Sequence, residues 1–225
     1  MEVTRRTIRA GGRRPGQPTL YSGRVADLPF PLEPHLASAL GAALDLEGKI
    51  PRALDALGPI GGRDVVLVGG GEGETKRLSE LGARVTLVDP IESSKPEGWS
   101  VADASADAVV ASWSAFRGID PFELAEAERV LRVDGRLLIL HDYGRDDVAR
   151  VRGDPPEHRE WSRRDGPFLR AGFRIRVIHC FWTFESLDGA RTFLRAAFGD
   201  AGGEFGDGLA RPRLSYNVAL YHRGR

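Results

Sequence analysis

The strongest constraint on the fold is a strand-loop-helix-strand unit over residues 64–89, which reads DVVLVGGGEGETKRLSELGARVTLVD. An apolar run, Val65–Val68, enters a loop with glycines at 69, 70, 71 and 73, and a second apolar run ends at Asp89. Glycines let a backbone approach a ligand where side chains would block it. An acid at the end of the next strand is a typical holder of ribose hydroxyls. The unit therefore predicts a site for a small molecule that carries a nucleoside.

Length and charge limit the organisation of the remaining chain. With 225 residues, one core and a decorated N-terminus are expected, which we divide into a flexible basic arm (1–19), an N-terminal helical or lid region (20–62) and an α/β domain (63–225). The 32 basic and 32 acidic residues cancel, so no global field attracts nucleic acid or membranes. Without an apolar stretch of membrane-spanning length or a signal-peptide core, we expect a cytoplasmic protein.

Strand and helix patterns alternate from residue 64 onwards. The best-marked helix follows Asp120 as N-cap, with Pro121 at its first position and Glu123 three residues after the cap. Alternation of this kind predicts an α/β fold, a doubly wound and mostly parallel sheet with helices on both faces. The expected strands are 65–68, 84–89, 107–112, 136–141, 173–181 and 214–222, and the last helix is expected over 187–198.

The glycine loop does not match the common phosphate-binding patterns. The sequence holds no Gly-Lys-Ser/Thr, and the dinucleotide pattern GxGxxG fails because its last position falls on Glu74 or on Lys76. Glu72 and Glu74 also occupy the start of the helix that would receive a pyrophosphate, and they would repel it. The loop therefore favours a nucleoside ligand that carries positive charge and no phosphate.

Several segments, taken in their order along the chain, resemble class I S-adenosylmethionine-dependent methyltransferases, in particular those of methyltransferase type 11. The resemblance rests on Gly69-x-Gly71-x-Gly73 with Asp89, on ADASADAVVAS (102–112) and on AEAERVLRVDGRLLIL (125–140), and it extends from Asp64 to the C-terminus. It implies a Rossmann-like fold in which the last two strands form an antiparallel closing pair. It also implies S-adenosylmethionine as the cofactor and S-adenosylhomocysteine as its product.

The resemblance assigns roles to individual residues. The loop from Gly69 through Gly70, Gly71 and Glu72 to Gly73 would wrap the methionine part, and Asp89 would hold the ribose diol. Ser112, at the end of the expected strand 107–112, would complete the cofactor site.

Two positions depart from the family pattern. Leu67 stands where the family usually carries an acid, a loss for which Glu72 could partly substitute. Only 17 residues separate Asp89 from Asp107, too few for the helix, strand and loop that the family places there. We therefore predict a shortened or lost helix and strand and a more open adenine pocket, with Lys95 near the place of the adenine-reading acid.

The densest polar cluster follows the expected strand 136–141. It contains the catalytic candidates His141, Asp142 and Tyr143, with His141 as a general base that Asp142 or Asp146 would orient. A hydrogen-bonded turn leaving the strand is an equally good reading of the cluster. No metal site is predicted, because no ligand spacing is diagnostic.

Three functions remain open at this level. The first is an S-adenosylmethionine-dependent methyltransferase acting on a small-molecule acceptor. The alternative is a catalytically degenerate, methyltransferase-like binding or scaffold protein with weak or no cofactor binding, which Leu67 and the short 90–106 segment favour. The third is an RNA-directed enzyme that uses the arginine-rich arm, the one route to nucleic acid that the sequence offers. No membrane partner is expected, and a homo-oligomer stays open.

Overall fold

A computed structural model describes residues 28–89, 98–153 and 156–225 of the chain. The basic arm and Lys95 lie outside these residues, so the predictions made for them stay predictions. No helix in the described ranges is long and apolar enough to cross a membrane.

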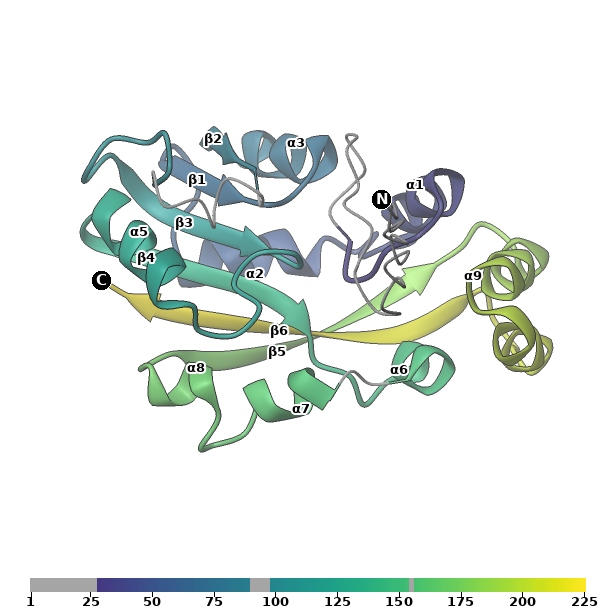
Figure 1. The fold of residues 1–225 in the computed structure, drawn as a ribbon. Coiled ribbons are helices and arrows are strands. Elements are labelled where there is room, and N and C mark those ends of the chain that lie inside the picture. Colours follow the sequence, from purple (N-terminus) through teal and green to yellow (C-terminus); the bar gives the residue numbers. More distant parts are fainter. Residues whose placement is uncertain (1–27, 90–97, 154–155) are drawn as a thin grey trace, which may run out of the picture.

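A six-stranded sheet forms the centre of the described structure, in the order β2-β1-β3-β4-β6-β5 (Figure 1). The first four strands in this order run parallel, and β6 runs antiparallel to both β4 and β5. The predicted mostly parallel sheet with an antiparallel closing strand is therefore confirmed. The strands are β1 (Asp64–Val68), β2 (Arg84–Val88), β3 (Ala106–Ser112), β4 (Leu131–Asp142), β5 (Arg174–Thr183) and β6 (Arg213–Gly224).

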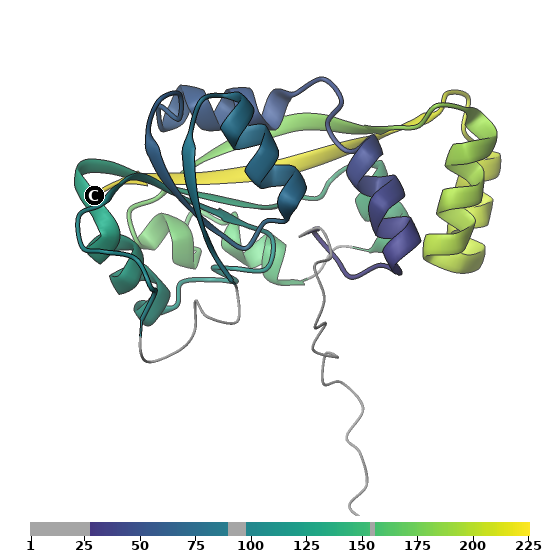
Figure 2. The same cartoon turned by 90° about the horizontal axis from the view of Figure 1, so that it is seen from above.

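Helices cover both faces of the sheet (Figure 2). One hydrophobic cluster joins β1, β3, β4, β5 and β6 to α1 (Pro34–Ala43), α2 (Lys49–Leu57), α3 (Glu72–Glu80), α6 (Asp147–Arg152) and α9 (Leu187–Asp207). On the other face a second cluster includes α5 (Pro121–Val130), α7 (Pro156–Trp161) and α8 (Pro167–Arg170). The two N-terminal helices thus pack into the same core as the sheet, since Leu40 and Leu54 are almost fully buried.

The start of α5 is as the sequence predicts. Asp120 is the N-cap, and its side chain accepts hydrogen bonds from the backbone nitrogens of Phe122 (2.8 Å) and Glu123 (3.1 Å). These bonds satisfy two of the amide groups that a helix start leaves open. The following strand begins directly at Leu131, five residues earlier than its apolar run indicates.

The register of the parallel strands brings distant residues to one edge. Val68 of β1 pairs with Val88 of β2 and with Ala111 of β3. The next residue on each strand is therefore Gly69, Asp89 and Ser112, which lie side by side at the carboxyl edge of the sheet. Open α/β sheets bind their ligands at this edge.

Strand β2 forms one margin of the sheet. Leu87 on this strand is 54% exposed, and the described residues between β2 and β3 form no further strand. Residues 90–97 lie outside the described residues, so the shortened or lost helix and strand stay a prediction.

Two helical segments differ from the sequence prediction. Helix α9 does not stop at residue 198 but continues to Asp207 after a kink at Gly199, where φ is 60° and ψ is −139°. A Cβ on Gly202 would lie 2.0 Å from the carbonyl oxygen of Leu194, so the second half packs closely against the first. Helix α6 follows the polar cluster after β4, where no helix was predicted.

Candidate functional site

The glycine loop after β1 has a left-handed backbone conformation, which costs free energy in residues other than glycine. Gly69 and Gly70 have φ values of 72° and 70°, in the left-handed region. The amide of Gly69 donates to the carbonyl of Val88 at 3.1 Å, which ties the loop to the end of β2. A Cβ on Gly70 would lie 2.9 Å from Cδ2 of Leu67, which is fully buried below the loop. The loop therefore requires glycine at Gly70 for the fold alone.

Gly73 differs from Gly70 in the space beside it. It lies in the first turn of α3, and no heavy atom is within 4 Å of the place where its Cβ would stand. The fold alone thus leaves open space beside this glycine. Alanine is normally favoured over glycine within a helix. A glycine with open space beside it is therefore a candidate for contact with a ligand.

Acidic side chains surround the loop as the sequence indicates. Glu72 is the first residue of α3 and is exposed, and Glu74 lies in the same turn. Asp89 is exposed directly after β2. Three carboxylates thus stand at one helix start and one strand end.

Ser112 ends β3 in a strained turn. Its side chain is fully buried, and its Oγ has no hydrogen-bond partner among the described residues. The turn that follows holds two residues other than glycine with positive φ, Trp113 (39°) and Phe116 (51°). Backbone strain and an unsatisfied buried hydroxyl each cost stability, and both are concentrated at functional sites.

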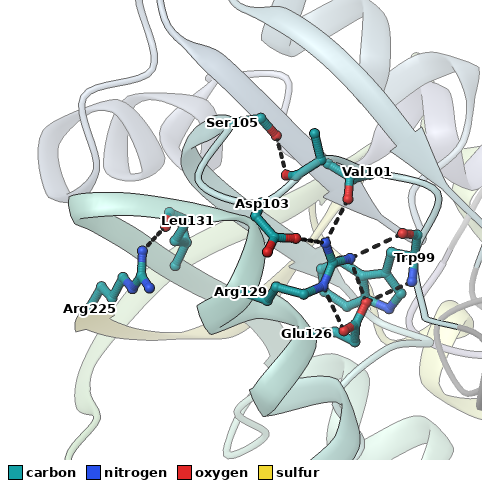
Figure 3. Close-up of polar contacts among 9 residues, drawn as sticks. Trp99, Val101, Asp103, Ser105, Glu126, Arg129, Leu131 and Arg225 are labelled. Carbon is teal, nitrogen blue, oxygen red and sulfur yellow. Dashed lines mark hydrogen bonds and ion pairs between the residues drawn. The ribbon is translucent and has the colours of Figure 1, made fainter.

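Residues 99–103, which precede β3, are held by side chains of α5 (Figure 3). Glu126 accepts a hydrogen bond from the backbone nitrogen of Trp99 at 2.7 Å. Arg129 donates to the carbonyl oxygens of Trp99 (3.1 Å) and Val101 (2.8 Å) and to Asp103 Oδ1 (2.5 Å). The hydrogen bonds from Arg129 hold the pKa of Glu126 below its usual value. This network fixes residues 99–103 against α5.

His141 lies inside an aromatic cluster. Its ring is 1% exposed, with centroids 4.7 Å from the Trp161 ring and 6.2 Å from the Phe168 ring. Nε2 lies 2.8 Å from the carbonyl oxygen of Phe116, where it holds the strained turn after β3. Burial lowers the pKa of His141 to about 3. Its role as general base stays a prediction, and these surroundings argue for a structural role.

This burial predicts a pH-dependent stability. Histidine in the unfolded chain has a pKa of about 6.5, so below about pH 6.5 it binds a proton that the folded His141 does not. The free energy of unfolding therefore falls as pH falls toward 3. Between pH 7 and pH 5 we expect a loss of about 2 kcal/mol from this residue. Urea unfolding at both pH values, in the unmodified chain and in His141→Phe, measures this loss. The variant should lack the part that His141 contributes. Equal losses in the two proteins would contradict the assignment.

Asp142 and Asp146 do not orient His141 as predicted. Successive strand residues point to opposite faces, and Asp142 faces Tyr216, whose hydroxyl donates to Oδ1. Asp142 Oδ2 also accepts from Arg152 Nη2 at 2.6 Å. Asp146 is the N-cap of α6 and accepts from the backbone nitrogens of Ala149 and Asn217.

Tyr143, the third catalytic candidate, is half-buried beside Arg145. Its hydroxyl accepts a hydrogen bond from Arg145 Nη1 at 3.3 Å, and the guanidinium carbon lies 5.3 Å from its ring centroid. Its backbone nitrogen donates to the carbonyl of Asn217 at 2.9 Å. The structure thus places Tyr143 in the turn after β4, and its catalytic role stays a prediction. No group of three or more His, Cys, Asp or Glu residues in the described ranges is placed to hold a metal ion.

A groove of about 500 Å³ opens next to this turn. Arg117 and Arg152 line it, and each is already paired, Arg117 with Glu157 at 2.8 Å and Arg152 with Asp142 at 2.6 Å. The groove therefore has no uncompensated arginine charge. Its lining residues are Pro29, Phe30, Pro31, Arg117, Arg152, Gly153 and His158.

Comparison with known proteins places this geometry in a fold family. No family model and no curated protein matches the sequence. Among solved structures, a protein described as a type II methyltransferase from Anaeromyxobacter dehalogenans aligns with a TM-score of 0.54 at 20% identity, over 78% of this chain and 94% of that one. The chain has the class I methyltransferase fold. A SAM-dependent methyltransferase from Aquifex aeolicus aligns with a TM-score of 0.46 at 17% identity, over 79% of this chain and 93% of that one.

The residues of this methyltransferase fold suit S-adenosylmethionine on two observations. Gly73 leaves open space beside the loop, and Ser112 carries a buried hydroxyl without a partner in the described structure. Gly69 lies next to Ser112 in register at the same edge. At Leu67 the fit is poorer, because a buried apolar side chain occupies the position of the family's acid.

The sequence did not single out one residue of the groove, His158. It lies on α7, is 4% exposed, and has Nδ1 at 3.8 Å from Asp142 Oδ2. Sixteen positions separate the two residues in the chain, and no local motif links them. Only the folding of α6 and α7 back over the end of β4 brings them together.

Proposed function

We propose that this chain is an S-adenosylmethionine-dependent methyltransferase that acts on a small-molecule acceptor. One observation carries the proposal: the strand register gathers Gly69, Asp89 and Ser112 at the carboxyl edge of the sheet. The class I methyltransferase fold supports it. Each of the three residues ends or follows a different strand, so their meeting is a property of the fold.

Different residues around the loop would bind different parts of S-adenosylmethionine. Backbone groups from Gly69 to Gly73 would hold the amino-acid end, and the Asp89 carboxylate would accept hydrogen bonds from the ribose diol. Glu72 and Glu74 stand at the start of α3. Their charge favours a ligand with a sulfonium and an ammonium group over one with phosphates.

When bound, S-adenosylmethionine supplies an activated methyl group, so the protein needs mainly to position the acceptor. The groove beside Arg117 and His158 is the candidate acceptor site, because it opens beyond the carboxyl ends of β3 and β4. Its volume of about 500 Å³ lies in the range of small-molecule sites. This size supports a small acceptor.

A catalytically degenerate scaffold protein is the alternative that a specific observation favours. Leu67 is fully buried and apolar where an acid would help to hold the loop and the cofactor's amino group. Strand β2 is the edge strand, so no described strand lies beyond it on the adenine side. Binding measurements separate this alternative from the enzyme.

A thermal-shift panel with S-adenosylhomocysteine, S-adenosylmethionine, NAD and ATP at millimolar concentration tests the ligand class. A ligand at about 100 times its Kd stabilises the folded state by about 2.7 kcal/mol. We expect a rise in Tm with the first two ligands and none with the two phosphate-bearing ones. Stabilisation by NAD or ATP alone would contradict the proposal.

A further inference from the structure

His158 and Asp142 form a pair that the glycine-loop site does not include. His158 lines the groove, and its Nδ1 is buried without a hydrogen-bond partner among the described residues. The nearest carboxylate oxygen, Asp142 Oδ2, is 3.8 Å from Nδ1. Because Nδ1 faces Asp142, Nε2 is the ring nitrogen left to meet a molecule in the groove. Catalytic hydrogen bonds are often this long before a substrate binds.

The carboxylate of this pair is firmly held. Asp142 is 2% exposed and accepts hydrogen bonds from Tyr216 through Oδ1 and from Arg152 through Oδ2. The guanidinium carbon of Arg152 lies 4.7 Å from the Phe30 ring centroid, at the wall of the groove. Two donors on different elements thus fix the carboxylate that faces His158, as expected for a group that orients a base.

The pair lies close to the cofactor edge. Asp142 ends β4, which is separated from β1 and its glycine loop by β3 alone. Neighbouring strands are about 4.8 Å apart, and Asp142 lies three residues past Ile139, which is level with Val68, so the ends of β1 and β4 are about 14 Å from each other. This spacing allows an acceptor in the groove to approach a ligand on the loop.

The charges that face His158 favour a neutral ring. Burial lowers the pKa of His158, and Arg152 and Arg117 act in the same direction. Asp142 and Glu157 raise it. His158 in turn helps to lower the pKa of His141. Burial is the largest of these effects, so His158 is unprotonated near neutral pH and can accept a proton.

The groove itself favours an aromatic and uncharged acceptor. Phe30 and two prolines, Pro29 and Pro31, provide flat apolar surface, and both arginines of the wall are paired. An anionic acceptor would have to compete with Asp142 or Glu157 for its arginine. An aromatic hydroxyl compound fills such a site with its ring and presents one acidic proton.

We propose that His158 is the general base of this site, that Asp142 orients it, and that the acceptor is a phenol. The proposal rests on the proposed function above. The phenol oxygen forms a bond to the methyl carbon while its proton passes to Nε2 of His158. The bond between the methyl carbon and sulfur breaks, and its electron pair stays on sulfur.

Turnover with two probe phenols tests this role. Phenol, with a pKa of about 10 like tyrosine, needs a base, whereas 4-nitrophenol is already ionised at mildly alkaline pH. His158→Gln should lower kcat for phenol by at least about 100-fold and for 4-nitrophenol by less than about tenfold. Its affinity for S-adenosylhomocysteine should match that of the unmodified chain. The control, His222→Gln, alters a histidine on β6 that does not line the groove.

Histidine NMR provides a second readout that needs no acceptor. In Asp142→Asn the titration midpoint of His158 should fall, because the negative charge beside Nδ1 is lost. An unchanged midpoint would overturn the pairing. This variant breaks a buried ion pair, so if it does not fold, the His158→Gln arm decides.

The outcomes separate the two proposals. Binding of S-adenosylhomocysteine without methylation of either phenol overturns the His158 proposal and leaves the proposed function intact. Equal loss with both phenols, or no loss in His158→Gln, also overturns it. Failure to bind S-adenosylhomocysteine overturns both.

Discussion

Asp142→Ala should lower the free energy of unfolding by about 3–5 kcal/mol, because it leaves the guanidinium of Arg152 without its buried partner. The side chains of Asp142 and Arg152 are 1% and 14% exposed, and their N–O distance is 2.6 Å. The hydroxyl of Tyr216 loses its acceptor in the same variant. Urea unfolding at neutral pH measures the change.

The matched control is Asp165→Ala. Asp165 also pairs with an arginine, Arg163 at 3.0 Å, but both side chains are well exposed, at 70% and 65%. Exposed pairs contribute little to stability, so we expect no measurable change in this variant. If Asp142→Ala costs no more than Asp165→Ala, the carboxylate is not buried as described.

Gly70→Ala should lower the free energy of unfolding by about 2–5 kcal/mol. Placing a residue with a Cβ at φ 70° costs about 1–2 kcal/mol, and overpacking against Leu67 adds about 1–3 kcal/mol. The new Cβ would lie 2.9 Å from a side-chain carbon of Leu67, which has no free space to move into because it is fully buried. Denaturant unfolding with a fixed m-value tests the prediction.

Gly73→Ala is the matched variant on the same loop. Its Cβ meets no atom within 4 Å, and alanine in a helical turn is favoured over glycine by about 0.5–1 kcal/mol. We expect a fold at least as stable as the unmodified chain and a weaker affinity for S-adenosylhomocysteine. Unchanged affinity in Gly73→Ala would mean that the open space beside Gly73 does not face the ligand.

The fold was largely predictable from sequence because its elements carry local signals. Alternating apolar strands and helices gave the mostly parallel sheet, and the antiparallel closing pair followed from the family resemblance. The Asp120 cap marked α5 correctly. In each case residues close in sequence determine the element, so a pattern suffices.

The second half of α9 was missed for a physical reason. The stretch GDAGGEFGD is rich in glycine, which has low helix propensity, so it reads as a loop. Yet Gly202 and Gly203 form helix because they let this segment approach the first half of α9, where a Cβ on Gly202 would meet backbone at 2.0 Å. Such tertiary packing overrides propensity and leaves no local signal.

The candidate site was predictable only in part. Gly69, Asp89 and Ser112 each follow a strand, so the register of a parallel sheet makes them neighbours. The polar turn after β4 was correctly located. His141 was predicted as its general base from closeness in sequence alone, and that role stays a prediction. Strand alternation turns His141 and Asp142 to opposite faces, and α7 then brings His158 to Asp142.

Isothermal titration of the intact chain with S-adenosylhomocysteine tests the central claim most directly, together with the variant Asp89→Ala. Loss of charge-assisted hydrogen bonds to a ribose diol, worth about 1.5–3 kcal/mol, weakens binding by about 10- to 100-fold. We predict saturable heat at one site in the unmodified chain and this weakening in Asp89→Ala. The absence of heat at millimolar ligand, with no rise in Tm, would contradict the account.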